Sequence, residues 1–146
     1  MNSELQESIR PPDHVNLHHI GFVVASIQES GPSFALALGA TWDRNIVFDP
    51  IQKVRVTFFR GRNATDPLIE LVEPGVPNSP VSRFLESGGG LHHLCYEVED
   101  LELHLEFCKL VGTIIISPPV PAEAFDGRRI AWALTRKRLL LEFLEH

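Results

Sequence analysis

Two stretches of the chain alternate between apolar and polar residues as half-buried strands do, at 15–25 and 90–98. Successive side chains of a strand point to opposite faces, so each stretch has one apolar face and one opposite face that carries the remaining residues. The predicted apolar faces consist of Ile20, Phe22 and Val24 in the first stretch and Leu94, Tyr96 and Val98 in the second. The strand pattern is therefore present twice, once near the start of each half of the chain.

A segment with helical spacing of apolar residues follows each of these strands, over 27–38 and 100–111. Ser26 and Asp100 stand directly before the two segments, where a side chain must accept hydrogen bonds from the first helical N–H groups. A glycine, the residue that most readily adopts the left-handed conformation at a helix end, follows each segment. These glycines are Gly39 and Gly112.

Extended segments follow each helix. They are predicted at 41–48, 53–60 and 67–73 in the first half, and at 113–117, 129–135 and 138–144 in the second. Each half therefore has the order β-α-β-β-β. The stretch 74–90 is rich in proline, glycine and serine and connects the halves, with a short helix expected at 79–86.

The two halves are also similar in sequence. The block Leu17-His18-His19-Ile20-Gly21 aligns with Leu91-His92-His93-Leu94-Cys95 at an offset of 74, and 68–73 aligns with 140–145 at an offset of 72. We therefore predict one domain over 15–146, made of modules 15–76 and 89–146, preceded by a flexible arm at 1–14. The fold class is α+β: two tandem βαβββ modules whose antiparallel sheets form an incomplete barrel around a cleft.

Composition and charge exclude several classes of protein. The 146 residues are 44% hydrophobic and 22% charged, as in ordinary globular domains. A net charge of −6 argues against nucleic-acid and anionic-membrane partners. Two cysteines are too few for a disulfide scaffold and fit a reducing compartment. The polar, acidic N-terminus has no secretory features, so the expected location is the cytoplasm.

The repeat places polar residues where strands need apolar ones. His19 and His93 lie on the strand faces opposite the apolar positions, and Glu70 and Glu142 lie inside strands of Leu, Ile, Val and Phe. An isolated buried carboxylate is costly, and a cation removes that cost. Two imidazoles and two carboxylates that converge in one cleft predict a divalent-metal site suited to Zn²⁺, Mn²⁺, Co²⁺, Ni²⁺ or Fe²⁺.

Each predicted ligand has a neighbour that competes with it. His18 and His92 share the parity of the apolar faces, so we prefer His19 and His93. Glu73 and Glu145 lie at strand ends, where solvation is expected. Cys95 has the parity of the cleft and is expected to be a small lining residue rather than a ligand.

The histidine and glutamate blocks, above all Gly88-Gly89-Gly90-Leu91-His92-His93-Leu94-Cys95-Tyr96-Glu97-Val98-Glu99-Asp100, resemble the vicinal-oxygen-chelate (glyoxalase/bleomycin resistance/dioxygenase) superfamily. Within it the chain is most similar to the branch that holds methylmalonyl-CoA epimerase and glyoxalase-like lyases. The resemblance covers about 15–146 and implies a glyoxalase-like fold, with metal ligands His19, Glu70, His93 and Glu142. It also implies a homodimer and a small-molecule substrate of the acyl-CoA thioester or hemithioacetal type.

The reaction implied by this resemblance begins with removal of a proton alpha to a carbonyl, with a divalent cation stabilising the enolate. Glu142 is the preferred base and Glu70 the second catalytic carboxylate. One segment departs from the epimerase pattern. Pro50 and Ile51 stand where acids are expected, so Asp49 is the remaining candidate for a second acid.

Two alternatives stay open at this point. The first is an Fe²⁺ extradiol-type dioxygenase that uses His19, His93 and Glu142 as a triad of two histidines and one carboxylate. The second is a binding or resistance protein of the same fold that sequesters a small molecule without catalysis.

Overall fold

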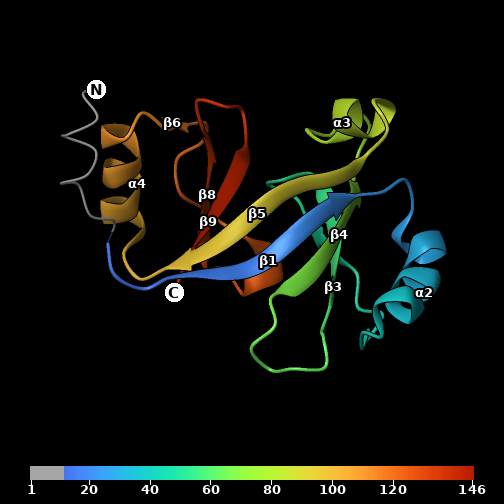
Figure 1. Ribbon diagram of the computed structural model, residues 1–146. Coiled ribbons are helices and arrows are strands. Elements are labelled where there is room, and N and C mark those ends of the chain that lie inside the picture. The colour runs from blue at the N-terminus through green and yellow to red at the C-terminus, as the bar shows by residue number, and fades with distance from the viewer. Residues whose placement is uncertain (1–11) are drawn as a thin grey trace.

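The structure, a computed structural model, describes residues 12–146, in which nine strands form one strongly curled sheet (Figure 1). Most of the predicted arm 1–14 lies outside the described residues. The first module contains β1 (Val15–Val23), α2 (Ile27–Leu38), β2 (Val47–Asp49), β3 (Val54–Phe59) and β4 (Leu68–Pro74). Helix α3 (Ser82–Glu86) lies in the connector. The second module contains β5 (Gly90–Val98), α4 (Leu101–Leu110), β6 (Ile114–Ile115), β7 (Val120–Pro121), the 3₁₀ helix η1 (Glu123–Phe125), β8 (Arg129–Leu134) and β9 (Leu140–Glu145).

The two modules share a single sheet with the order β2-β3-β4-β1-β5-β9-β8-β6, and β7 pairs with β8. Strands β1 and β5 run antiparallel through its middle and join the modules. The predicted α+β half-barrel is therefore confirmed. Within each module, however, the sheet is mixed, because β1 pairs with β4 and β5 pairs with β9 in parallel. The helix that crosses over after β1 or β5 reverses the chain direction, which makes a parallel return possible.

Side-chain caps fix the helix starts where the sequence placed them. The Ser26 hydroxyl accepts a hydrogen bond from the Glu29 N–H at 3.2 Å, and the Asp100 carboxylate accepts one from the Leu103 N–H at 2.9 Å. Gly39 ends α2 in the left-handed conformation with φ 62°. The bounds of α2 agree with the prediction, and those of α4 differ by one residue at each end.

The segment predicted as a strand at 41–48 is extended only at its end, in β2. Asp43 accepts a hydrogen bond from the Asn45 N–H, and Arg44 adopts a positive φ of 63°. A local side-chain bond of this kind competes with strand pairing. In the second module β6 is also shorter than the segment predicted at 113–117. It is followed by β7 and η1, which the periodicity did not indicate.

Each helix packs on the convex side of its own module, so α2 and α4 lie at opposite ends of the sheet (Figure 1). Ile27 of α2 packs with Phe59 and Leu71, and the predicted apolar residues Phe22 and Val24 join this core. The residues that form the core beneath α4 are Val98, Leu101, Leu105, Cys108, Ala131, Ala133 and Phe143. The concave face of the sheet is thereby left free for a cavity. Among the described helices, none is long and apolar enough to cross a membrane.

One polar group lies within the α4 core without a partner. His104 is 5% exposed, packs against Phe143 at a ring separation of 4.5 Å, and its Nδ1 has no hydrogen bond. Burial lowers the pKa of His104 below its ordinary 6.5. The unfolded chain therefore takes up a proton at this residue more readily than the folded chain does.

We expect His104→Leu to raise the free energy of unfolding by about 1–2 kcal/mol, because it removes an unsatisfied buried polar group. It should also weaken the loss of stability as pH falls below 6.5, since protonation of His104 favours the unfolded state there. Urea denaturation between pH 5 and pH 8 measures both effects. Glu106→Gln, on the exposed side of the same helix, is the matched control, and an equal stabilisation by both variants would contradict the explanation.

Candidate metal centre

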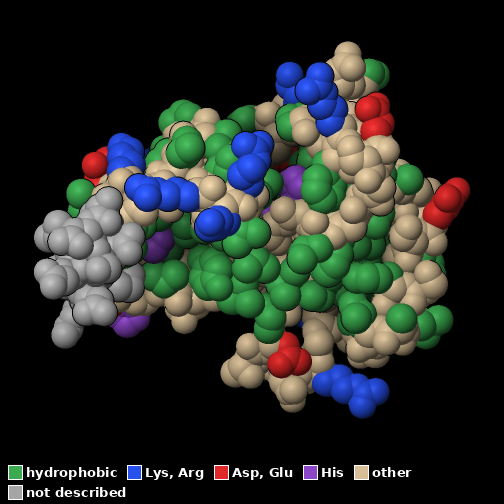
Figure 2. Space-filling view, turned by 45° about the horizontal axis from the view of Figure 1, so that its top comes forward, with side chains coloured by type: hydrophobic (Ala, Val, Ile, Leu, Met, Phe, Trp, Pro, Cys, Tyr) green, Lys and Arg blue, Asp and Glu red, His purple; other side chains and the backbone are tan. Residues whose placement is uncertain are grey.

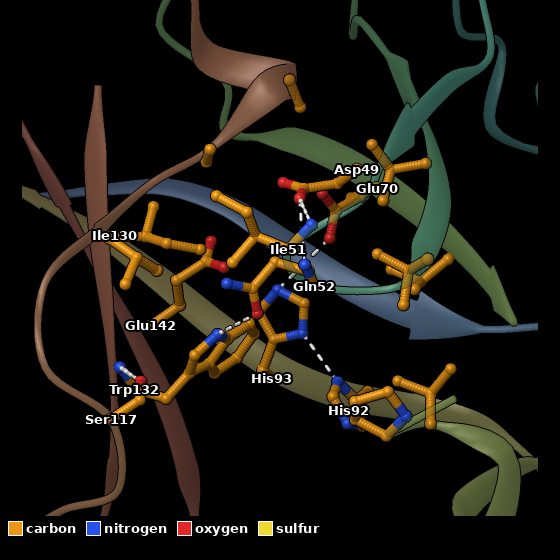
Figure 3. Close-up of a pocket in the computed structure, with 18 of the residues that line it drawn as sticks. Asp49, Ile51, Gln52, Glu70, His92, His93, Ser117, Ile130, Trp132 and Glu142 are labelled. Carbon is orange, nitrogen blue, oxygen red and sulfur yellow. Dashed lines mark hydrogen bonds and ion pairs between the residues drawn. The ribbon is translucent and has the colours of Figure 1, made fainter. Parts of the chain in front are cut away.

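Four side chains from four strands meet on the concave side of the sheet. His19 comes from β1, Glu70 from β4, His93 from β5 and Glu142 from β9. All four are buried, with exposed fractions of 0% for His19 and 4–5% for the others. Figure 3 shows Glu70, His93 and Glu142 directed into one cavity from three different strands. The structure thus brings together every residue that the sequence proposed as a metal ligand.

The atoms that face one another are nitrogen and oxygen acceptors at short range. The Nε2 of His19 lies 3.2 Å from the Nε2 of His93, 3.2 Å from Oε1 of Glu142 and 3.6 Å from Oε1 of Glu70. The Nε2 of His93 lies 3.3 Å from the same Glu70 oxygen. Bonds of about 2.0–2.2 Å to one divalent cation place neighbouring ligand atoms about 3–3.6 Å apart. The spacing therefore fits a cation held by His19, Glu70 and His93, with Glu142 beside it at 3.2 Å from Nε2 of His19.

Glu142 supplies a second sign of fit. Its Oε1 is one of two buried side-chain nitrogen or oxygen atoms in the described chain that have no hydrogen bond, the other being Nδ1 of His104. A buried carboxylate oxygen without a partner is costly, and cation coordination satisfies it. His19, Glu70 and His93 form a group whose ligand atoms all lie within 4.8 Å of one another.

The charges of the site favour ionised glutamate. Burial alone raises the pKa of Glu142, but the hydrogen bond and charge of His19 outweigh it and bring the pKa to about 2. Burial likewise lowers the pKa of His19, and the nearby charges of Glu70 and Glu142 reverse this and raise it. Glu142 is therefore a carboxylate at neutral pH, as a ligand or a general base must be.

Strand pairing explains why these side chains converge. In the β1–β5 ladder His19 faces Cys95, and Gly21 faces His93. Gly21 and Cys95 occupy equivalent positions of the repeat, so each histidine ring lies opposite a small residue. A Cβ added at Gly21 would lie 2.1 Å from Cε1 of His93, which leaves no room for any side chain there. The prediction that Cys95 is a small residue beside the site agrees with this arrangement, and burial raises the pKa of its thiol well above the ordinary value.

The predicted placement of His18 and His92 on the apolar side is wrong. The β1–β5 ladder skips one residue on each strand, His18 in β1 and His92 in β5. Each skipped residue is a β-bulge, which turns its side chain to the same side as its neighbour. The Nδ1 of His18 lies 2.8 Å from Nδ1 of His19, and the same two atoms of His92 and His93 are also 2.8 Å apart. Both bulged residues therefore contact the proposed ligands.

Glu73 and Glu145 are held by arginines instead of being solvated as predicted. Glu73 accepts hydrogen bonds from Arg55 at 2.7 Å and from the Ile27 N–H at 2.8 Å. Glu145 pairs with Arg129 at 2.8 Å. Both glutamates thus stabilise strand and helix ends, which leaves Glu70 and Glu142 as the carboxylates of the site.

Glu70, His93 and Glu142 border a cavity of about 460 Å³ on the concave face. Its walls are largely apolar, and within the described chain its lining includes no lysine or arginine. Figure 2 shows the hollow from outside, with a histidine side chain at its bottom. Trp132 forms one wall, packs edge-on against His93 at 4.8 Å and donates a hydrogen bond to Gln52 across the cavity (Figure 3). His19 lies deeper, covered by Phe125, whose ring stacks on it at 5.7 Å.

The loop at 49–53 closes the half-barrel but supplies no free acid. Asp49 is 4% exposed, and its Oδ1 accepts hydrogen bonds from the N–H groups of Ile51 and Gln52, both at 2.9 Å. Its Oδ2 accepts one from the Glu123 N–H of η1 at 3.1 Å. Asp49 therefore fixes the loop and joins the two modules. Ile51 lines the cavity at a position where the epimerase pattern has an acid.

Residues 18–132 match the family model of the Glyoxalase/Bleomycin resistance protein/Dioxygenase superfamily. The chain belongs to this superfamily. The resemblance noted from the sequence is confirmed, and the half-barrel is the fold of the superfamily's glyoxalase-like members.

Several relatives within the superfamily are named as epimerases. The chain is 30% identical to the mitochondrial methylmalonyl-CoA epimerase of Dictyostelium discoideum over 80% of its length and 68% of the relative's. It is 29% identical to an ethylmalonyl-CoA/methylmalonyl-CoA epimerase of Cereibacter sphaeroides, over 78% of this chain and 84% of the relative. The crystal structure of methylmalonyl-CoA epimerase from Mycobacterium tuberculosis superimposes with a TM-score of 0.80 at 20% identity, covering 96% of this chain and 94% of that one.

We expect Gly21→Ala to displace the His93 ring and to lower the affinity for Co²⁺ by about 10–100-fold, because the new Cβ overlaps the ring. Titration of the metal-free protein with Co²⁺ measures the loss. Gly31→Ala is the control, since its Cβ would lie 2.3 Å from the Trp42 ring, away from the site. The control should lose stability but keep its affinity; a folded Gly21→Ala protein with wild-type affinity would exclude His93 as a ligand.

We expect Asp49→Ala to lower the free energy of unfolding by about 1–3 kcal/mol, because it removes the acceptor of three part-buried backbone N–H groups. Asp43→Ala, which removes a single exposed bond to the Asn45 N–H, should cost less. Urea denaturation compares the two variants. A stable Asp49→Ala protein with no catalytic activity would instead identify Asp49 as an acid or base.

Proposed function

We propose that the protein is a divalent-metal-dependent enzyme that removes a proton alpha to the carbonyl of an acyl-CoA-type thioester. The observation that carries this proposal is the buried set of His19, Glu70, His93 and Glu142, with an unsatisfied Glu142 oxygen at the edge of a cavity. Hydrophobic cores do not normally bury two carboxylates and two imidazoles together unless a cation or another partner balances the buried charge. The arrangement is instead typical of a site that holds a cation.

A divalent cation held by these four residues supplies positive charge that polarises a substrate carbonyl and stabilises the enolate. The protein contributes position and exclusion of water. His19 and His93 direct Nε2 toward the centre, and Phe125 covers His19 from above. The apolar walls keep the local dielectric low, which strengthens each electrostatic interaction at the reacting carbon.

Glu142 is the proposed base. Its side chain borders the cavity and is ionised at neutral pH, and its Oε1 has only the His19 ring nitrogen beside it, at 3.2 Å. Glu70 borders the same cavity from the other module and is the candidate to hold or return the proton. Asp49 is excluded from this role by its three backbone hydrogen bonds.

The names of the relatives favour a thioester over a hemithioacetal. All three proteins described above carry methylmalonyl-CoA in their names, and the apolar walls of the cavity suit a short branched acyl group. A dioxygenase triad is disfavoured because Glu70 lies with the other three ligands, at a position that oxygen and substrate would otherwise use. A binding protein needs no cation with two carboxylates at the edge of its cavity, so Glu70 and Glu142 favour catalysis.

The proposal predicts that the protein, loaded with Co²⁺, exchanges the alpha hydrogen of methylmalonyl-CoA for deuterium in D₂O. Glu142→Gln should reduce this exchange by about 10²–10⁴-fold, the usual contribution of a general base. Glu73→Gln is the control, because Glu73 is bound to Arg55 away from the cavity, and it should retain wild-type exchange. NMR of the substrate measures the rate.

The hemithioacetal of methylglyoxal and glutathione, tested in parallel, identifies the alternative substrate class. Loss of exchange in both Glu142→Gln and Glu73→Gln would contradict the assignment of the base. Oxygen consumption by the Fe²⁺-loaded protein would support the dioxygenase, and tight binding of either substrate without exchange would support the binding protein.

A further inference from the structure

We propose that His18 and His92 are positioning residues, which accept a hydrogen bond from Nδ1 of the adjacent histidine and so hold its Nε2 toward the cavity. This inference rests on the proposed metal site. Each module contains two consecutive histidines, His18-His19 in the first and His92-His93 in the second. Only the second histidine of each pair is a proposed metal ligand. The structure places the first histidine of each pair in contact with the second.

The contact depends on an irregularity in the sheet. Neighbouring residues of a regular strand point to opposite faces, so two consecutive imidazoles do not normally meet. The β1–β5 ladder shifts its register between Leu17 and His19 and again between Gly21 and Phe22, and these shifts leave His18 and His92 unpaired in the ladder. Two bulges at equivalent positions of two modules have produced the same contact twice.

The atoms in contact define the direction of the bond. In both pairs the separation is between Nδ1 and Nδ1, at 2.8 Å, so one hydrogen is shared between two ring nitrogens. His19 and His93 face each other through Nε2 at 3.2 Å. A ligand nitrogen must offer a lone pair, so the ring hydrogen of a ligating histidine lies on the other nitrogen. Nδ1 of His19 and His93 therefore donates, and Nδ1 of His18 and His92 accepts.

The accepting rings are themselves fixed by aromatic neighbours. His18 meets the edge of Phe125 at 5.5 Å, the same phenylalanine that stacks on His19. His92 meets Phe84 of α3 at 4.8 Å and lies 6.1 Å from Trp132. An acceptor held in place restricts rotation of the donor ring. Each ligand histidine is thus oriented by a bond on one side of its ring while the opposite nitrogen faces the site.

Two kinds of substitution separate this role from simple packing. Asparagine keeps an acceptor oxygen near the position of Nδ1 but has no aromatic ring, whereas phenylalanine keeps the ring and has no acceptor. We expect His92→Phe and His18→Phe to weaken Zn²⁺ binding by about 10–100-fold, as loss of such partners does elsewhere. His92→Asn and His18→Asn should stay within about threefold of wild type. Competition with a chromogenic chelator measures the affinity.

The opposite ranking, with the Phe variants retaining affinity and the Asn variants losing it, would show that the rings only pack and would overturn the proposal. Equal losses in both kinds of variant would overturn it as well. The visible spectrum of the Co²⁺-loaded variants adds an independent readout. It should change in the Phe variants, because the ligand rings are free to turn, and match wild type in the Asn variants.

The ring-nitrogen ¹⁵N shifts of the Zn²⁺-loaded wild-type protein test the same idea without any variant that must fold. We expect Nδ1 of His18 and His92 to be unprotonated and Nε2 to carry the hydrogen. A proton on Nδ1 of either residue would overturn the proposal for that pair. Absence of Zn²⁺ and Co²⁺ binding by the wild type would overturn the proposed function, whereas a Zn²⁺-loaded protein with that proton on Nδ1 would overturn this inference alone.

Discussion

Burial of two carboxylates against two imidazoles is the constraint around which the rest of the molecule is arranged. Ligand atoms 3.2–3.6 Å apart, in a part of the sheet that solvent scarcely reaches, repel or strain one another unless something satisfies them. Helices α2 and α4 pack in the two cores of the other face, whereas α3 and η1 pack with apolar strand residues on the concave side and leave the cavity between them. The apolar walls and the polar centre therefore lie on the same side of the sheet.

The repeat makes such a site with little additional structure. Each module delivers one histidine from its first strand and one glutamate from its last, and the antiparallel pairing of β1 with β5 brings the two sets together. The parallel pairs β1–β4 and β5–β9 matter equally, because they hold each glutamate beside the strand that carries a histidine. Small residues at Gly21 and Cys95 then make room for the rings.

Sequence periodicity predicted those features that depend on local rules. Helix starts follow from Ser26 and Asp100, whose side chains accept from N–H groups three residues away. The positions of His19 and His93 follow from the regular pairing between them, in which His19 to Gly21 face Cys95 to His93. Periodicity did not predict side-chain positions that depend on a residue in another strand. A bulge is a property of two paired strands, so His18 and His92 could not be placed from one strand alone. The ion pair of Glu145 could not be predicted either, because its partner Arg129 lies on the neighbouring strand.

The loop at 49–53 is where this chain departs from the epimerase pattern, and the contacts of Asp49 give that departure a physical meaning. A carboxylate that accepts three backbone hydrogen bonds is held at a fixed position, with both oxygens engaged by the loop and by η1 rather than directed at a substrate. The neighbouring Ile51 adds apolar surface at the cavity mouth. This leaves the two glutamates of the site as the candidates for the proposed acid–base chemistry. In that proposal one carboxylate comes from each module, Glu142 from the second and Glu70 from the first, so that removal and return of a proton would involve both halves of the repeat.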